Sequence, residues 1–301
     1  MSGAMPTNGR KVCPVMSTTF IKHSVLSIAA ATSLAAPALA EGDWLEHAAN
    51  PVTNPIFFES AQIQSEVRPL FLHHRLDDGF VGGGSVNVYA LQLRYAVNDR
   101  LAIIATKDGY IDTHTPGLGN RGGWGDLAAG LKYAVIRDDA NQFLVTPGFT
   151  ITLPTGNEEV FQGRGKGEWN AFVSALKGFG DFHVSANVGA RLPNDLSKNT
   201  ASLHYSAQVD YYTCQWFIPF VSINAFTTLN GADGLPITTE GFDLINFGSG
   251  HANGQTQAAV GGGFRSRILP NLDLGFGYEV EITDQTDIFK DRFTVDVSWR
   301  F

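Results

Sequence analysis

The chain has 301 residues, 44% of them hydrophobic and 17% charged, and its 29 acidic residues outnumber 21 basic ones, which gives a net charge of −8 at pH 7. This acidic balance argues against nucleic acid as a partner. Beyond residue 40 no run of about 18 apolar residues occurs, which excludes a helical membrane protein and leaves a soluble protein or a membrane β-barrel.

Residues 1–40 have the organisation of a secretory signal peptide. Lys22 and His23 precede an uncharged run of aliphatic and small residues, which ends in Ala-Leu-Ala directly before Glu41. Signal peptides have this order of charged, apolar and small residues, and their apolar part is too short to span a membrane. We expect Met16 to be the true start. A buried hydrophobic helix is the alternative, but it does not account for the small residues before the acidic stretch.

Residues 41–60 are predicted to form a periplasmic N-terminal segment, and residues 61–301 to form the main domain. Within this domain apolar side chains recur at every second position, as between Phe182 and Leu192. A period of two is typical of strands with one apolar and one polar face. The pattern predicts strands at residues 61–75, 84–97, 101–112, 124–137, 141–153, 167–179, 181–192, 200–213, 215–229, 254–268, 271–283 and 288–301.

The connections between these strands alternate in length. Tight turns follow most even-numbered strands, whereas longer segments rich in glycine, proline, asparagine and charge follow most odd-numbered ones, the longest being residues 230–253. Outer-membrane barrels have an even number of strands, short periplasmic turns and longer external loops. The sequence therefore predicts an all-β fold, a 12-stranded antiparallel transmembrane β-barrel of the bacterial outer membrane.

Aromatic side chains lie on the apolar faces beside the short turns, where an interfacial girdle is expected. The last strand keeps its alternation up to Phe301, as it must if it pairs with the first strand and leaves no backbone group unpaired in hydrocarbon. A terminal aromatic at this position resembles the signature that barrel-assembly machinery recognises, so we expect that machinery as a partner. The predicted girdle comprises Tyr95, Tyr133, Phe143, Phe182, Tyr211, Phe217, Trp299 and Phe301.

One stretch of the chain resembles a known bacterial family. Gly125-Asp126 is followed by Gly-Leu-Lys-Tyr at 130–133, then by a short turn, and then by Leu-Pro-Thr-Gly at 153–156. This combination resembles the family described as transporters of the MetA pathway of phenol degradation. The resemblance implies an outer-membrane barrel for uptake of small, aromatic or hydrophobic compounds, and it transfers no ligand-binding residue.

If apolar side chains face lipid, the alternate set faces the lumen. A lysine or arginine on the lipid side at mid-membrane costs about 2–4 kcal/mol, so basic residues belong inside. Lys107 conflicts with this rule because the strand pattern places it on the apolar face. The lumenal charges could line a solute path or pair with each other and plug the barrel. The candidate lumen-lining residues are Arg68, Gln92, Arg94, Lys132, His183, Arg191, His204, Asp210, Arg265, Glu279, Glu281 and Asp296.

The sequence favours an outer-membrane channel or transporter for passive uptake of small solutes, with outer-membrane lipid and a small-molecule solute as partners. No cofactor, metal ion or catalytic residue is expected. The first alternative is a non-catalytic structural or surface-binding barrel with a plugged lumen. The less favoured one is an outer-membrane lipid hydrolase, because His251 lies next to Ala252 and lacks the serine nucleophile that such a histidine would activate.

The predicted external segment 230–253 is long for a loop and contains Phe242, Leu244, Ile245 and Phe247. Loops of this length usually have a function or are disordered. The segment could fold inward as a constriction, cover the barrel as a lid, or move freely.

Overall fold

The computed structural model describes residues 43–283 and 289–301, so the predicted signal peptide at 1–40 and the predicted start at Met16 lie outside the described residues. The described chain forms one closed antiparallel sheet, in which β1 pairs with both β2 and β15. Two short helices, α1 (Asp43–His47) and η1 (Glu158–Val160), accompany the sheet. Within the described residues, no helix is long and apolar enough to cross a membrane. The strands are β1 (Glu66–Leu76), β2 (Gly84–Ala96), β3 (Leu101–Lys107), β4 (Tyr110–Thr115), β5 (Gly119–Trp124), β6 (Leu127–Tyr133), β7 (Ile136–Asp138), β8 (Phe143–Leu153), β9 (Glu168–Phe179), β10 (Phe182–Pro193), β11 (Ser202–Tyr211), β12 (Ile218–Thr228), β13 (Thr256–Leu269), β14 (Leu272–Glu281) and β15 (Phe289–Arg300).

Some of these strands are parts of a longer one. β3 and β4 both pair with β2 and together form one spanning strand, interrupted at Asp108 and Gly109. β5 and β6 pair with β4 and β3 and continue each other in the same way. β7 is a short extension that pairs with β8. The wall therefore has twelve spanning strands, and the predicted 12-stranded antiparallel barrel is confirmed.

The fourth spanning strand begins earlier than the sequence pattern indicated. It starts at Gly119 rather than at residue 124, and β4 and β5 form a hairpin through residues 116–118. The stretch 119–124 has three glycines and no apolar alternation, so it resembled a loop. Pairing between Asp112 and Gly122 and their neighbours supplies the backbone hydrogen bonds that its side chains do not indicate.

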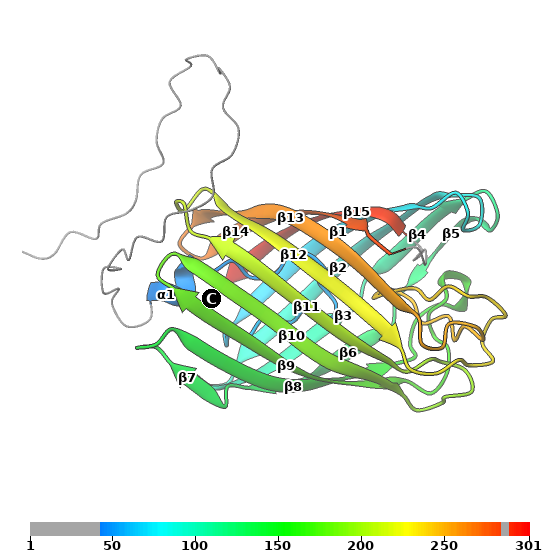
Figure 1. Cartoon of the computed structure of the whole chain (residues 1–301), viewed down its shortest axis with the longest axis horizontal. Coiled ribbons are helices and arrows are strands. Elements are labelled where there is room, and N and C mark those ends of the chain that lie inside the picture. Colours follow the sequence, from blue (N-terminus) through cyan, green and yellow to red (C-terminus); the bar gives the residue numbers. More distant parts are fainter. Residues whose placement is uncertain (1–42, 284–288) are drawn as a thin grey trace, which may run out of the picture.

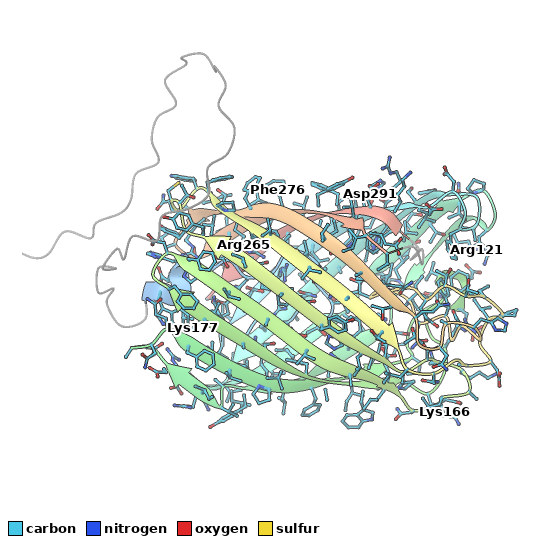
Figure 2. All side chains as sticks on the ribbon, viewed as in Figure 1. Arg121, Lys166, Lys177, Arg265, Phe276 and Asp291 are labelled. Carbon is cyan, nitrogen blue, oxygen red and sulfur yellow. The ribbon has the colours of Figure 1, made fainter. Side chains whose placement is uncertain are left out.

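The two ends of the barrel differ in their connections. The C-terminus and α1 lie at the end with the tight turns, and the long segment between β12 and β13 lies at the other end (Figure 1). Lys177 and Lys166 mark these two ends in Figure 2. The backbone N–H of Phe301 donates to the Ser65 carbonyl at 3.2 Å, so the seam between the first and last strands stays paired to the last residue.

The two faces of the wall follow the predicted alternation over most strands. The girdle residues Tyr95, Tyr133 and Trp299 are exposed on the outside, while polar inward side chains are buried. Strand β1 departs from this rule, because its apolar residues Leu70 and Leu72 point inward and are buried. They join an apolar cluster inside the barrel. The cluster includes Phe57, Leu70, Leu72, Leu76, Val86, Val88, Ile111, Phe226, Phe242, Leu244, Phe247 and Phe289.

Candidate functional site

Residues 43–65, here called the plug segment, run through the inside of the barrel. The Ala49 N–H donates to Asp210 Oδ1 at 3.2 Å, Asn54 Nδ2 donates to Ser206 Oγ at 3.1 Å, and Ser174 Oγ donates to the Glu59 carbonyl at 2.7 Å. The segment thus contacts several different strands of the wall. This lumenal position differs from the periplasmic one predicted for residues 41–60, because its partners lie far away in the sequence and leave no local pattern.

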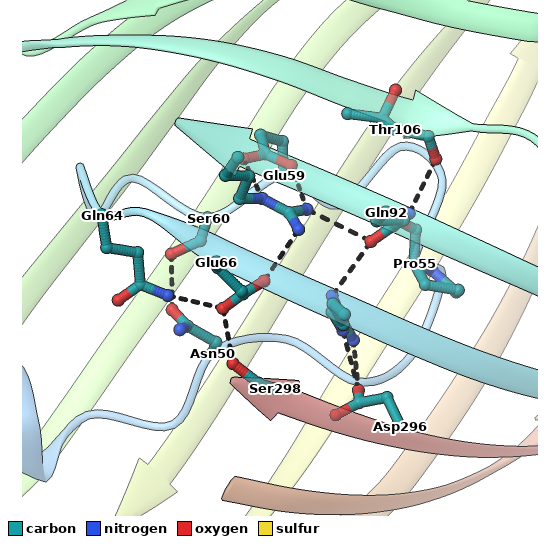
Figure 3. A network of polar contacts seen from close by, with 12 residues as sticks. Asn50, Pro55, Glu59, Ser60, Gln64, Glu66, Gln92, Thr106, Asp296 and Ser298 are labelled. Carbon is teal, nitrogen blue, oxygen red and sulfur yellow. Dashed lines mark hydrogen bonds and ion pairs between the residues drawn. The ribbon is translucent and has the colours of Figure 1, made fainter. Parts of the chain in front are cut away.

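Glu59 of the plug segment lies at the centre of an ionic network (Figure 3). Its Oε2 accepts a hydrogen bond from Arg94 Nη2 at 2.6 Å, and its Oε1 accepts one from Lys132 Nζ at 2.7 Å. Arg94 Nη1 also pairs with Glu66 Oε1 at 2.9 Å, and Lys132 Nζ donates to the Ser60 carbonyl at 2.8 Å. Two barrel cations are therefore neutralised by one carboxylate that belongs to no strand.

The electrostatics of Glu59 show how strongly the network favours its charged form. Burial alone would raise the pKa of this carboxyl group, because a charged group loses hydration inside a protein. The positive charges of Arg94 and Lys132 and their hydrogen bonds outweigh that effect and lower the pKa from 4.5 to about 2. Glu59 is therefore ionised at neutral pH and holds the plug segment to β2 and β6.

A second group of charges joins the plug segment to the seam between the terminal strands. Asp296 accepts a hydrogen bond from Arg265 Nη1 at 2.8 Å and also pairs with Arg68. Arg265 Nε donates to the Asn50 carbonyl at 2.7 Å, and Arg68 Nη2 donates to the Pro51 carbonyl at 2.8 Å. These arginines satisfy plug-segment carbonyls that would otherwise be buried without partners.

Residues 230–253, here called the inward loop, close the other half of the lumen. Asp243 accepts two hydrogen bonds from Arg292 Nη1, at 2.6 and 2.8 Å, and Arg292 also pairs with Glu279 at 2.8 Å. Phe242 and Phe247 are buried in the internal apolar cluster. The structure thus favours the constriction among the three possibilities for this loop, and its apolar residues belong to the same cluster as the inward leucines of β1.

The candidate lumen-lining residues lie on the inner face of the wall. Eleven of the twelve are buried, and Glu281, near the rim, is half-buried. Most are already engaged: His183 Nδ1 lies 2.9 Å from Asp210 Oδ1, and His204 Nε2 lies 2.7 Å from Asn170 Oδ1. Sequence reasoning missed their partners in the plug segment and the inward loop.

Lys107 lies inside the barrel, although its position in the sequence pattern was on the lipid side. The pairing of β3 with β6 shifts between Ala105, which faces Ala129, and Lys107, which faces Ala128. This bulge lets consecutive residues Thr106 and Lys107 both be buried inside. The irregularity removes the conflict with a lysine in lipid, and it was not visible in the sequence because a bulge leaves composition unchanged.

An apolar groove of about 800 Å³ lies on the outer surface beside the interruption between β3 and β4. There the Leu91 N–H donates to the side chain of Asp108 at 2.8 Å instead of to a strand neighbour. At Gly109, φ is 103°, and a Cβ would lie 2.4 Å from the Tyr89 carbonyl oxygen, so only glycine fits. The groove is lined by Pro69, Leu70, Phe71, Tyr89, Ala90, Leu91, Asp108, Gly109, Trp124, Gly125, Leu127, Thr155, Val295, Asp296 and Val297.

Comparison with known proteins gives a family and a fold. Residues 69–297 match the family described as "Putative MetA-pathway of phenol degradation", whereas among curated proteins no sequence matches the chain. The structure is similar to the COG4313 outer membrane channel from Pseudomonas putida F1, with 17% identity, 88% of this chain and 100% of that chain covered, and a TM-score of 0.53. It is also similar to the NanC porin, with 11% identity, 79% and 100% coverage and a TM-score of 0.49. At 17% identity, the similarity to the COG4313 channel shows that the two proteins share the barrel fold, and nothing more.

Proposed function

Because the chain belongs to the MetA-pathway of phenol degradation family, as its sequence motif predicted, we propose that it is a channel for passive uptake of small solutes across the bacterial outer membrane. One observation carries this proposal: the groups that pair with cations of the inner wall come from outside the wall. Arg94 and Lys132 of the wall are paired by Glu59, and Arg265 is bonded to the Asn50 carbonyl. These partners belong to the plug segment, which is not part of the sheet.

The distinction between wall and plug matters for gating. A barrel of eight strands is filled by its own side chains, whereas larger barrels enclose cavities or channels. In this twelve-stranded barrel the plug segment and the inward loop occupy the space. Either could move without breaking a hydrogen bond between spanning strands, since neither pairs in the closed sheet. A charged path would then open along the inner face.

Small aromatic or hydrophobic compounds are the solutes that agree with the family to which the chain belongs. The family description, which names phenol degradation, supports this assignment. Charges of both signs on the inner wall favour neutral solutes over strong selection for one ion. The outer-membrane channel in the comparison has a similar fold, and its role is extended to this chain only as part of the proposal.

A permanently plugged, non-catalytic barrel is the second candidate. It is favoured by the small size of two spaces lined by described residues: one cavity near the rim measures about 20 Å³, and one beside the plug segment measures about 10 Å³. Each holds at most one or two water molecules. A lipid hydrolase remains testable with a lipid hydrolysis assay, although Ala252 stands where a nucleophile would be needed.

A disulfide that fixes the plug segment to the wall distinguishes the channel from the permanently plugged barrel. Thr53 Oγ1 of the plug segment lies 2.9 Å from Ser222 Oγ of β12, so a Thr53→Cys, Ser222→Cys double variant places two thiols in contact. We expect measurable conductance in planar bilayers when this variant is reduced and loss of conductance when it is oxidised. The single variant Thr53→Cys is the control and should conduct under both conditions.

The other outcomes have clear meanings. If wild type and both variants never conduct and vesicles containing them do not take up small neutral solutes, the plugged barrel replaces the channel. If oxidation leaves conductance unchanged while the disulfide is verified by mass spectrometry, the solute path does not require movement of the plug segment.

A further inference from the structure

The small cavity near the extracellular rim has a charged group that the solute path does not explain. The bulge in β3 directs Lys107 into this cavity, and the lysine is only 7% exposed. Among residues 43–283 and 289–301 its ammonium group has no hydrogen-bond acceptor or ion-pair partner. By contrast, Lys132 on the neighbouring strand β6 pairs with Glu59 and donates to the Ser60 carbonyl. The Lys107 ammonium group therefore has its hydrogen-bond donors free toward the cavity that it lines, where they can bind a ligand with acceptor oxygens.

The other charges around the cavity leave an excess of positive charge. Asp126 already accepts hydrogen bonds at Oδ1 from the N–H groups of Gly156, at 2.9 Å, and Gly163, at 2.8 Å. Glu168 pairs with Arg191 Nε at 2.8 Å. The wall thus holds three cations, Lys107, Arg164 and Arg191, against these two carboxylates, and Arg164 Nη2 donates to the Gly234 carbonyl at 3.4 Å.

The size and lining of the cavity restrict what it can bind. Its volume of about 20 Å³ holds one or two atoms the size of a water oxygen. The two oxygens of a carboxylate match that space, whereas the larger tetrahedral phosphate group does not. Asn199 and Asn246 also line the cavity, and Asn246 Nδ2 donates to the Thr200 carbonyl at 2.8 Å.

We propose that this cavity binds the carboxylate group of a small organic acid, with Lys107 as the main cation and Arg164 as the second. Phe161 forms part of the same wall and presents an apolar surface to the carbon end of the acid. Binding requires no conductance, so this proposal is independent of the channel function. It assigns a carboxylate as the ligand of a site that the family membership does not specify.

Thermal unfolding of the purified full chain in detergent tests the proposal with acetate as the probe. We expect sodium acetate to raise the Tm in a saturable manner, whereas acetamide, which has the same shape without the charge, leaves it unchanged. Lys107→Met should weaken acetate binding at least tenfold, and Arg164→Gln, which alters a loop residue, should weaken it by a smaller factor. Lys166→Met is the matched control, because Lys166 lies exposed at the same rim (Figure 2) and pairs with Asp195 at 3.4 Å.

Several results would overturn the site. Equal protection by acetate and acetamide would show that the carboxylate charge does not matter. Equal protection by sodium chloride would replace the carboxylate by a general anion effect. Full acetate binding by both Lys107→Met and Arg164→Gln would place the ligand elsewhere. A barrel that conducts but gives no acetate response would refute this site and leave the proposed channel intact.

Discussion

Two buried lysines on neighbouring strands have opposite surroundings. Lys132 on β6 is paired by a carboxylate and a carbonyl of the plug segment, whereas Lys107 on β3 faces a cavity in which each acid has another partner. Both lysines are buried, so the difference lies in which partners the chain brings to their ammonium groups. The partners of Lys132 stabilise a closed lumen, whereas the charge of Lys107 remains available to a ligand. Burial of a charge therefore does not by itself reveal its role.

The largest expected effect comes from removing the shared partner of Lys132. Glu59→Gln leaves Lys132 and Arg94 without their common carboxylate, and loss of one member of a buried ion pair costs about 3–5 kcal/mol. We expect the free energy of unfolding in urea to fall by that amount. Glu158→Gln, at an exposed acid in η1, should change it little. An unchanged unfolding midpoint for Glu59→Gln would mean that the network does not hold the plug segment.

The pH dependence of stability sharpens the same comparison. Because folding lowers the pKa of Glu59 from 4.5 to about 2, the carboxylate stabilises the folded state fully above pH 4.5 and loses this effect as the pH falls toward 2. The urea midpoint of the wild type should decrease through this window. Glu59→Gln should lack that part of the decrease, and identical slopes for the two proteins would contradict the assignment.

The ion pair of the inward loop should have a smaller effect. Asp243→Asn weakens two hydrogen bonds to Arg292, but Glu279 still neutralises this arginine. Hydrogen bonds to charged groups contribute roughly 1.5–3 kcal/mol, so we expect a loss of about 2 kcal/mol in urea unfolding. Limited proteolysis should also cut residues 230–253 faster in the variant than in the wild type. Equal cleavage rates would show that the apolar cluster alone holds the loop.

The smallest expected effect has the opposite sign. Replacing a buried charge by an apolar residue of similar size is often stabilising, so Lys107→Met should increase the free energy of unfolding by about 1 kcal/mol in the absence of a ligand. Lys132→Met is the matched comparison and should be destabilising, because it leaves Glu59 with one partner fewer. If both variants shift stability in the same direction, the contrast between the two lysines is wrong.

The sequence predicted the wall well because a strand in a barrel records its environment at every second residue. Alternation and loop lengths gave the strand number and the outward positions of residues such as Tyr95 and Trp299. The prediction of inward and outward positions failed where the inner face of a strand packs against other parts of the protein instead of facing an open lumen. The inward leucines of β1 share an apolar cluster with Phe242 and Phe247, which lie more than 150 positions away in the chain, so no local pattern reveals this packing.

The candidate site was predictable only in part for the same reason. Lumenal residues such as Arg94 and Asp296 could be assigned to the inner face from phase alone. Their partners could not, since Glu59 and the Asn50 carbonyl belong to a segment without periodicity. Lys107 required knowledge of the bulge in β3, which depends on how β6 aligns with it. The face on which a strand residue lies can thus be predicted from its position in the sequence, whereas its partners can be identified only from the three-dimensional structure.

The plug segment precedes the first strand, and its anchors include residues on β15, the last strand to be synthesised. Asp296, which supports the two arginines that bond to the Asn50 and Pro51 carbonyls, becomes available only when that strand arrives. The plug segment is therefore secured late in biogenesis, at about the moment the barrel closes. We expect an assembly intermediate lacking the final strand to leave its amino-terminal residues open to periplasmic proteases, so that unfinished barrels are marked for removal.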